Sequence, residues 1–211
     1  MENVERINPL ARGSAPLTTW LVLLAWFFVA LALGTSGALS GRGGPPIAMG
    51  LAITIPLLAF AVDGRLGHPL FRGLVGLSPA ALVAIQIPRV LGVVFLVAWW
   101  RGTLPAGFAL PAGLGDVAIG LAAPFVAAAI AARRPGHRTL ARVWNLLGLA
   151  DLIVAVASGV LHASATFGGL ATTVNSAALA VYPLSLIPTF LVPLAVMLHI
   201  ASLRATRNEE D

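Results

Sequence analysis

Long uninterrupted apolar stretches, separated by short polar connections, are the main pattern along this chain. A helix needs about 20 apolar residues to cross the hydrocarbon core of a bilayer. Strands of a membrane barrel instead alternate polar and apolar residues, and a run such as 21–29 (LVLLAWFFV) does not alternate. Windows that reach or nearly reach the required length predict six transmembrane helices, at about residues 17–36, 46–62, 79–100, 114–132, 140–162 and 182–203.

These windows predict an all-α fold: a polytopic transmembrane helix bundle that forms one domain. It lies between an N-terminal tail (residues 1–16) and a C-terminal tail (residues 204–211). Hydrophobic residues make up 58% of the chain and charged residues only 10%, whereas a soluble domain has about 25% charged residues. A soluble core could not hide so much apolar surface in 211 residues, but lipid can receive it directly.

The chain contains no cysteine and no lysine. The missing cysteine excludes disulfides, thiolate metal sites and cysteine nucleophiles, and the missing lysine excludes a Schiff base such as that of a retinal pigment. The net charge of +5 comes from arginines that flank the apolar windows. Orientation in a membrane explains these arginines better than nucleic-acid binding does.

The arginines gather on one side of the predicted bundle. Ten of them lie in the two tails, in the second connection, and in the fourth connection with the start of the fifth span. They are Arg6, Arg12, Arg65, Arg72, Arg133, Arg134, Arg138, Arg142, Arg204 and Arg207. The other side holds Arg42 and Arg101. The positive-inside rule therefore predicts that both termini lie in the cytoplasm, which requires an even number of spans.

A cleaved signal peptide is the alternative to an uncleaved first span. Arg6 and Arg12 precede an apolar run, and small residues follow that run, as in a signal peptide. The leading segment is long, however, and it contains Glu2 and Glu5. These features favour an uncleaved span.

Three connections between the windows are unusual. Residues 63–78 place apolar side chains between two arginines and predict a short amphipathic helix along the inner surface. Residues 164–181 carry no charge, so they either pack on or dip into the outer face of the bundle, or form an ordinary ordered loop. Residues 104–113 are dense in proline and glycine, and they predict a turn or a partly inserted stretch before the fourth span.

Arg89 lies near the centre of the third window, where an arginine costs about 2.5–3.5 kcal/mol on insertion scales. We therefore expect its side chain to face protein or water. Gln86 lies one turn earlier on the same helical face. Pro88 removes a backbone donor between these two residues and predicts a kink, with a polar group or water filling the gap.

Acidic residues in two other windows are candidate partners for Arg89. Asp151 lies near the centre of the fifth window, on a stripe of small and polar residues that includes Asn145 and should face the bundle interior. Asp116 is expected near the outer end of the fourth window, and His199 one turn from the inner end of the sixth. The simplest expectation is an ion pair of Arg89 with Asp151 or Asp116, which forms a functional site or only holds the helices together.

Motifs for common cofactors are missing. The sequence has no Gly-rich phosphate loop, no His-Glu-x-x-His metal motif and no Gly-x-Ser-x-Gly elbow. We therefore expect no ATP, NAD or retinal, no metal site and no catalytic residue, which favours a role other than an enzyme. His199 is the candidate axial ligand of a haem b, or it lines a haem or quinone pocket with Gln86 and Asn145.

Four stretches carry a resemblance to other proteins: 86–89 (QIPR), 109–116 (ALPAGLGD), 144–152 (WNLLGLADL) and 187–193 (IPTFLVP) continued to His199. Taken together they resemble a group of small bacterial inner-membrane proteins with no known activity. The resemblance covers about residues 77–203, from the third window to the sixth. It implies a multi-pass protein of the bacterial inner membrane, and it implies no activity.

Three functions remain open at this point. The first, which we favour, is binding or translocation of a small solute, ion or proton at a polar site formed by Arg89, Gln86, Asp116, Asp151 and Asn145. The second is a haem- or quinone-binding redox protein. The third is a non-catalytic accessory or assembly subunit whose polar residues connect helices. The expected partners are the lipid bilayer, a small molecule and further copies of the chain, and not nucleic acid.

Overall fold

The structure is a computed structural model that describes residues 15–40, 46–67, 69–163, 169–170 and 173–207. Residues 1–14 of the predicted N-terminal tail, residues 208–211 of the C-terminal tail and part of the 164–181 connection lie outside these described residues, as do Arg6, Arg12 and Arg42. Within the described part every regular element is helical, and it contains no strand. The predicted all-α class is therefore confirmed.

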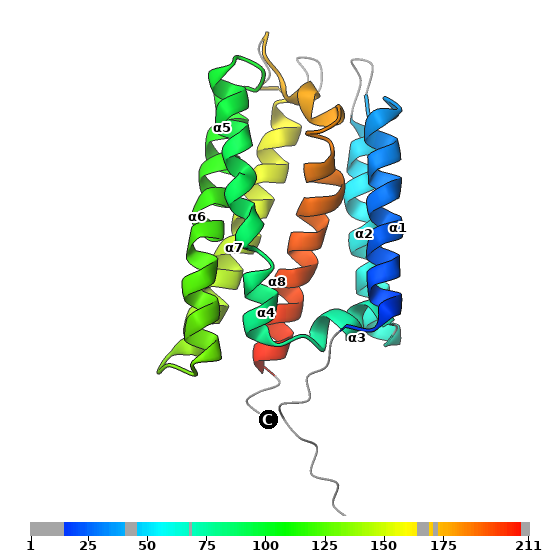
Figure 1. The fold of residues 1–211 in the computed structure, drawn as a ribbon. Coiled ribbons are helices and arrows are strands. Elements are labelled where there is room, and N and C mark those ends of the chain that lie inside the picture. Colours follow the sequence, from blue (N-terminus) through cyan, green and yellow to red (C-terminus); the bar gives the residue numbers. More distant parts are fainter. Residues whose placement is uncertain (1–14, 41–45, 68, 164–168, 171–172, 208–211) are drawn as a thin grey trace, which may run out of the picture.

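The helices follow one another along the chain and stand side by side in a bundle (Figure 1). The α-helices are α1 (Leu17–Thr35), α2 (Ile47–Leu66), α3 (Pro69–Val75), α4 (Pro79–Ala84), α5 (Val93–Trp100), α6 (Ala106–Ala131), α7 (His137–Leu161) and α8 (Val192–Arg207). Two 3-10 helices, η1 (Ile87–Gly92) and η2 (Ser176–Ala180), and a π-helix, η3 (Ile187–Leu191), complete the described elements. Six helical segments are long and apolar enough to cross a membrane, at 17–35, 47–66, 79–100, 106–131, 137–161 and 187–207.

The start of α6 corrects the prediction for residues 104–113. This segment is not a turn, because α6 begins at Ala106 rather than at about residue 114. Pro105 stands at the N-cap, where a missing N–H costs no helical hydrogen bond, and Pro111 is accepted inside the helix. Asp116 therefore lies about 15 Å along the axis from the first residue of α6, in the middle of the helix and not near its end.

Two other spans are shifted from their predicted bounds. Helix α2 continues to Leu66, beyond the predicted end at 62, and stops at Gly67, whose φ of 69° favours glycine. The last helical segment begins at Ile187 and not at 182, and it continues to Arg207. The predicted short helix in 63–78 is found as α3, which crosses below the bundle between α2 and α4 (Figure 1).

Prolines mark the irregular turns within the third and sixth spans. Between α4 and α5 the chain forms the 3-10 helix η1, with Pro88 in its first turn, so the regular α-helix is interrupted where the sequence predicts a kink. Pro188 has the same place in the π-helix η3, directly before α8. Arg89 follows Pro88 inside η1, so the central arginine lies on an irregular segment rather than on a regular helix.

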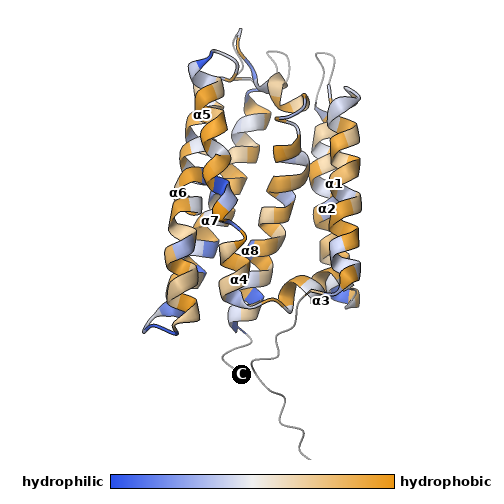
Figure 2. Ribbon diagram, in the orientation of Figure 1, coloured by the Kyte–Doolittle hydropathy of each residue, from blue (hydrophilic) through white to orange (hydrophobic). Residues whose placement is uncertain are grey.

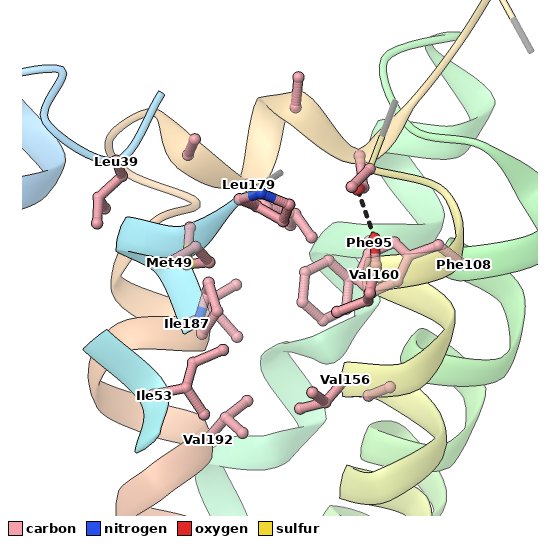
Figure 3. A pocket seen from close by; sticks show the side chains of 18 of the residues that line it. Leu39, Met49, Ile53, Phe95, Phe108, Val156, Val160, Leu179, Ile187 and Val192 are labelled. Atoms are coloured by element: carbon pink, nitrogen blue, oxygen red, sulfur yellow. Dashed lines mark hydrogen bonds between the residues drawn. The ribbon is translucent and has the colours of Figure 1, made fainter. Parts of the chain in front are cut away.

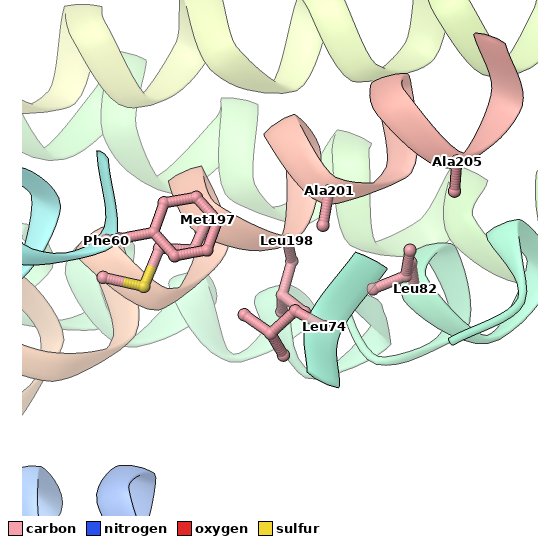
Figure 4. Packing of buried hydrophobic residues seen from close by; sticks show 7 residues of the cluster. All are labelled: Phe60, Leu74, Leu82, Met197, Leu198, Ala201 and Ala205. Atoms are coloured by element: carbon pink, nitrogen blue, oxygen red, sulfur yellow. The ribbon is translucent and has the colours of Figure 1, made fainter. Parts of the chain in front are cut away.

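Apolar side chains fill the contacts between helices and also cover the outside of the bundle. One core cluster joins α2, α3, α4 and α8 through Phe60, Leu74, Leu82, Met197, Leu198, Ala201 and Ala205 (Figure 4). Many large apolar side chains are exposed, including Phe125 at 75% and Ile153 at 69%. Figure 2 shows apolar residues along the height of the helices and hydrophilic residues mostly at their ends.

Candidate functional site

Arg89 is the centre of a polar cluster inside the bundle, and its side chain is only 9% exposed. Its Nε donates to Asp116 Oδ1 of α6 at 2.7 Å, and its Nη2 donates to Asp151 Oδ2 of α7. Its Nη1 lies 3.0 Å from His199 Nε2 of α8. One guanidinium therefore connects four segments of the chain, η1, α6, α7 and α8.

A chain of hydrogen bonds continues from His199 and determines its tautomer. Asn145 Nδ2 donates to Ala141 O at 2.8 Å and to Ser202 Oγ at 3.0 Å, so the amide oxygen of Asn145 is the atom that faces His199 Nδ1 at 2.8 Å. That oxygen can only accept, so Nδ1 carries the proton. His199 Nε2 is then an acceptor for Arg89 Nη1. The network is therefore consistent with a neutral His199.

Three polar side chains of the cluster each lie over a glycine of a neighbouring segment. A Cβ atom added at Gly92 would overlap Asp116, one at Gly115 would overlap Asp151, and one at Gly148 would overlap His199. Gly120 likewise lets the backbone of η1 approach α6, since a Cβ there would lie 2.5 Å from Val90 N. These glycines allow the helices to come close enough for the side chains to reach Arg89.

The structure brings together most of the residues that the sequence predicts for the site. Arg89 pairs with both candidate acids, whereas the prediction was a pair with one of them. Asn145 enters the cluster through His199. Gln86 does not, because its Nε2 donates to the backbone oxygen of Ala195 at 3.2 Å.

His199 is the residue whose predicted environment needs the largest correction. It was expected one turn from the inner end of the sixth span, as a haem ligand or as part of a haem or quinone pocket. Its side chain is instead fully buried, at 0% exposure, and packs against Trp144 with ring centroids 5.1 Å apart. The shift of α8 toward residue 207 explains this position, because it places His199 in the middle of the helix.

Three participants were not identified from the sequence. Gly92 lies under Asp116, Ser202 binds Asn145, and Trp144 covers His199 while its Nε1 donates to Ile119 O at 3.3 Å. The position of Ser202, three residues after His199 on the same helical face, is a signal that could have suggested its role. Gly92 likewise lies three residues after Arg89.

The charges within the cluster do not balance when both acids are ionised. One guanidinium faces two carboxylates, and the neutral His199 adds no charge. Asp116 and Asp151 are only 13% and 11% exposed, so water screens this excess weakly. An excess negative charge in a protein interior is costly unless a proton or a cation compensates it.

A cavity of about 290 Å³ reaches the cluster at Asp116. Its walls are mainly apolar and come from α2, α5, α6, α7, η2, η3 and the start of α8. Figure 3 shows Met49 and Ile53 of α2 opposite Val156 and Val160 of α7. Asp116 is the one charged side chain among the described residues that line this cavity.

Comparisons with known proteins place the chain within one family. The family model described as "Domain of unknown function (DUF8737)" matches residues 75–207, a range that contains α4 to α8 and the whole polar cluster. No curated protein and no solved structure matches the chain. The resemblance to an uncharacterised family is thus confirmed. Because the model matches more than half of its length, the chain belongs to the family of domain of unknown function DUF8737.

Proposed function

We propose that the protein crosses a bilayer six times, with both termini on the cytoplasmic side of a bacterial inner membrane. Six helical segments have sufficient length and apolar character, and their outward side chains are mostly apolar. Eight of the described arginines lie at the end of the bundle that holds α3 and the last turn of α8, namely Arg65, Arg72, Arg133, Arg134, Arg138, Arg142, Arg204 and Arg207 (Figure 1). Arg101 lies at the opposite end, and this imbalance is the support for the orientation.

Cysteine labelling tests the orientation directly, because the natural chain contains no cysteine. Thr103 and Thr139 are both exposed and lie at opposite ends of the bundle. In intact bacterial cells, an impermeant maleimide should label a Thr103→Cys variant and should label Thr139→Cys only after the cells are opened. The reverse pattern would contradict the proposed orientation, and equal labelling of both in intact cells would contradict membrane insertion.

We further propose that the Arg89 cluster binds, and passes across the membrane, a small solute, ion or proton. The observation that carries this proposal is the pairing of two carboxylates with one guanidinium in a poorly exposed site. A pair that only connected helices would need one acid for one arginine. The second acid leaves a place for an exchangeable proton or a small cation, and the cavity at Asp116 offers a route to it.

Reconstituted liposomes test this function. Wild-type protein should admit protons, Na⁺ or K⁺ faster than protein-free liposomes under an imposed membrane potential, as measured with dyes for pH and for each cation. Asp116→Asn and Asp151→Asn should abolish this entry. Asp63→Asn should keep it, since Asp63 is the remaining described carboxylate and lies at the end of α2. If no ion enters and native mass spectrometry finds no retained small molecule, the proposal fails.

The alternative of a haem protein receives less support from this geometry. An axial haem ligand needs a free ring nitrogen, but both ring nitrogens of His199 lie within hydrogen-bonding distance of Asn145 or Arg89. A visible absorption spectrum of purified protein from haem-replete cells distinguishes the two functions. An accessory or homo-oligomeric role, in which the cluster only connects helices, predicts co-purification with a fixed partner and no effect of Asp116→Asn on ion entry.

A further inference from the structure

We propose that the cavity beside Asp116 binds a small organic cation with one positive charge and an apolar body, in exchange for a proton. This inference rests on the proposed function and names its substrate class. The charged nitrogen would lie at the Asp116 carboxylate, and the apolar part would lie along the cavity walls. Four features of the described residues support this assignment: the wall chemistry, the charge, the occupied donors and the size.

The walls of the cavity favour an apolar body. Phe95 and Phe108 form part of one side, with ring centroids 5.2 Å apart. Val156, Val192 and Ile187 also line the cavity. Aromatic rings beside a cation also attract its positive charge, which adds to the contact with the carboxylate.

The charge of the cluster favours a cation over an anion. With both acids ionised, Arg89, Asp116 and Asp151 together carry one excess negative charge. Asp116 is the member of the cluster that lines the cavity, and its Oδ1 already accepts from Arg89 Nε. An anion would bring further negative charge to this place, whereas a monovalent cation would neutralise the excess.

The guanidinium donors beside Asp116 are occupied within the cluster, which disfavours a neutral acceptor such as a quinone next to that carboxylate. Arg89 is directed to Asp116, Asp151 and His199. At the opposite end of the cavity, Ser176 Oγ donates to Gly159 O at 2.7 Å. A quinone carbonyl next to Asp116 would meet a carboxylate and would therefore find an acceptor in place of a donor.

The volume and position of the cavity limit the size of the cation. About 290 Å³ is just below the range of about 300–1,000 Å³ that is usual for ligand pockets, so the cation is compact. Met49 and Ile53 of α2 close one side of the cavity (Figure 3). Helix α2 is otherwise weakly buried, with Phe60 as its buried residue, so this wall is the one most easily displaced for entry.

Binding of the cation would displace a proton from the cluster. The titratable and charged groups that face one another here are Arg89 of η1, Asp116 of α6, Asp151 of α7 and His199 of α8. In the empty site one proton would be shared between the two carboxylates. When the cation enters, this proton leaves to water, and the net charge of the cluster stays the same. Cation binding should therefore weaken as the pH is lowered.

Equilibrium dialysis with labelled benzyltrimethylammonium tests the proposal on full-length protein in lipid nanodiscs, with empty nanodiscs on the other side. The charge of this probe is fixed, so any pH dependence belongs to the protein. We expect saturable binding that unlabelled probe displaces. Neopentylbenzene, in which a carbon replaces the nitrogen, and benzenesulfonate should not displace it.

Two variants test separately whether binding needs the charge of Asp116 and whether it needs the space of the cavity. Asp116→Asn should weaken probe binding by about tenfold or more, a change equal to about 1.4 kcal/mol or more, whereas Asp63→Asn should bind like wild type. Val156→Trp fills the cavity without changing a charge and should also abolish binding. Its control is Val154→Trp, because Val154 is 48% exposed on the same helix. Loss of binding in Asp116→Asn and Val156→Trp, but not in their controls, supports the proposal.

Other results would overturn it. Wild-type affinity in Asp116→Asn, or equal displacement by neopentylbenzene, would exclude the carboxylate as the binding group. Affinity that does not change as the pH falls would exclude exchange with a proton. If the wild type fails to bind the probe but still admits protons in an Asp116-dependent way, the organic cation is wrong and the proposed function stands. If both are missing, both proposals fall.

Discussion

The first two long helices and the four spans that follow are similarly apolar, but different interactions hold them in the bundle. Helices α1 and α2 contribute no residue to the Arg89 cluster, and α1 carries no charged residue. The later spans, from α4 to α8, are joined through buried polar side chains and through glycines that allow close approach. The family model matches this later part and not α1 or α2.

Aromatic side chains make several of the contacts of the N-terminal pair. Trp26 and Phe27 of α1 pack on Phe190 of η3, with ring centroids 4.7 Å and 5.3 Å apart. Phe60 of α2 packs on Phe71 of α3 at 5.1 Å. Such contacts differ little in energy from contacts between apolar side chains and lipid. They therefore define the position of α1 and α2 in the bundle only weakly.

The comparison teaches that hydropathy and helix packing are separate properties of a span. Hydropathy shows that a helix can cross a membrane, and α1 and α6 satisfy this criterion equally well. The identity of the neighbouring helix depends on small and polar residues, which are denser in α6 than in α1. Substitutions in the two regions should therefore have unequal effects, and four pairs of variants test this.

The largest effect is expected at Arg89. Arg89→Met leaves two carboxylates facing each other without a cation, and breaking a buried ion pair in this way costs about 3–5 kcal/mol. Arg65→Met, at the exposed end of α2, should change stability by less than about 0.5 kcal/mol. Titration with sodium dodecyl sulfate in mixed micelles, followed by tryptophan fluorescence, measures both. Equal stability of the two variants would show that the cluster does not hold the later spans together.

A smaller but still clear difference is expected between two helical glycines. Gly115→Ala should destabilise the protein by about 1–3 kcal/mol, because the new methyl group overlaps Asp151. A Cβ at Gly50 of α2 meets nothing within 4 Å, so Gly50→Ala should stabilise by about 0.5–1 kcal/mol through helix propensity. The same titration shows whether each variant is less or more stable than the wild type. A gain in stability for Gly115→Ala would refute the close approach of α6 and α7.

The aromatic contact of α2 should contribute less. Phe60→Ala removes the pair with Phe71, and such a pair is worth about 0.5–1.5 kcal/mol beyond the area it buries. In the unfolded state lipid can make the remaining apolar contacts of this side chain. The loss of stability should therefore be smaller than the loss of about 3–5 kcal/mol that is seen in water-soluble cores. Leu58→Ala, at a position that is 60% exposed, is the matched control and should have no effect. If Phe60→Ala lost as much stability as Arg89→Met, the distinction between the N-terminal pair and the later spans would be wrong.

The smallest effect is expected for single neutral hydrogen bonds. Asn145→Ala breaks the bonds from α7 to His199 and Ser202 of α8, and bonds between membrane helices are worth about 0.6 kcal/mol on average. Thr35→Ala removes a bond within α1, to Leu31 O at 2.9 Å, and should leave stability unchanged. If the threonine variant were the less stable of the two, the polar chain from Asn145 would have no role in packing.

The existence of six long helices could be predicted from the sequence, but their ends could not all be predicted. Windows of apolar residues give the number of spans because length and hydropathy decide whether a helix can cross a bilayer. The start of α6 was missed because Pro105 and Pro111 suggested a turn, whereas one of them caps the helix and the other lies inside it. Local propensity is a weak guide where neighbouring helices hold a segment in place.

For the site, the sequence identified the charged residues and the depth of Arg89 and Asp151, but neither the depth of Asp116 nor the way the three residues connect. Arg89, Asp116 and Asp151 stood out because ionisable groups are rare in apolar spans. The Arg89 guanidinium can bind both acids because Asp116 lies in the middle of α6. This position could not be predicted without the start of that helix. The close approach at Gly92 and the link from Asn145 to Ser202 depend on helix rotation, which a single sequence does not define.

The glycines beneath the polar side chains follow the order of the chain. Gly92 lies under Asp116 of α6, Gly115 of α6 lies under Asp151 of α7, and Gly148 of α7 lies under His199 of α8. During synthesis on the ribosome, each emerging helix therefore brings its polar group to a recess that the preceding helix already provides. The recesses for Asp116, Asp151 and His199 can therefore form stepwise between neighbouring spans, whereas Arg89 makes its contacts with Asp151 and His199 only after α7 and α8 have been synthesised.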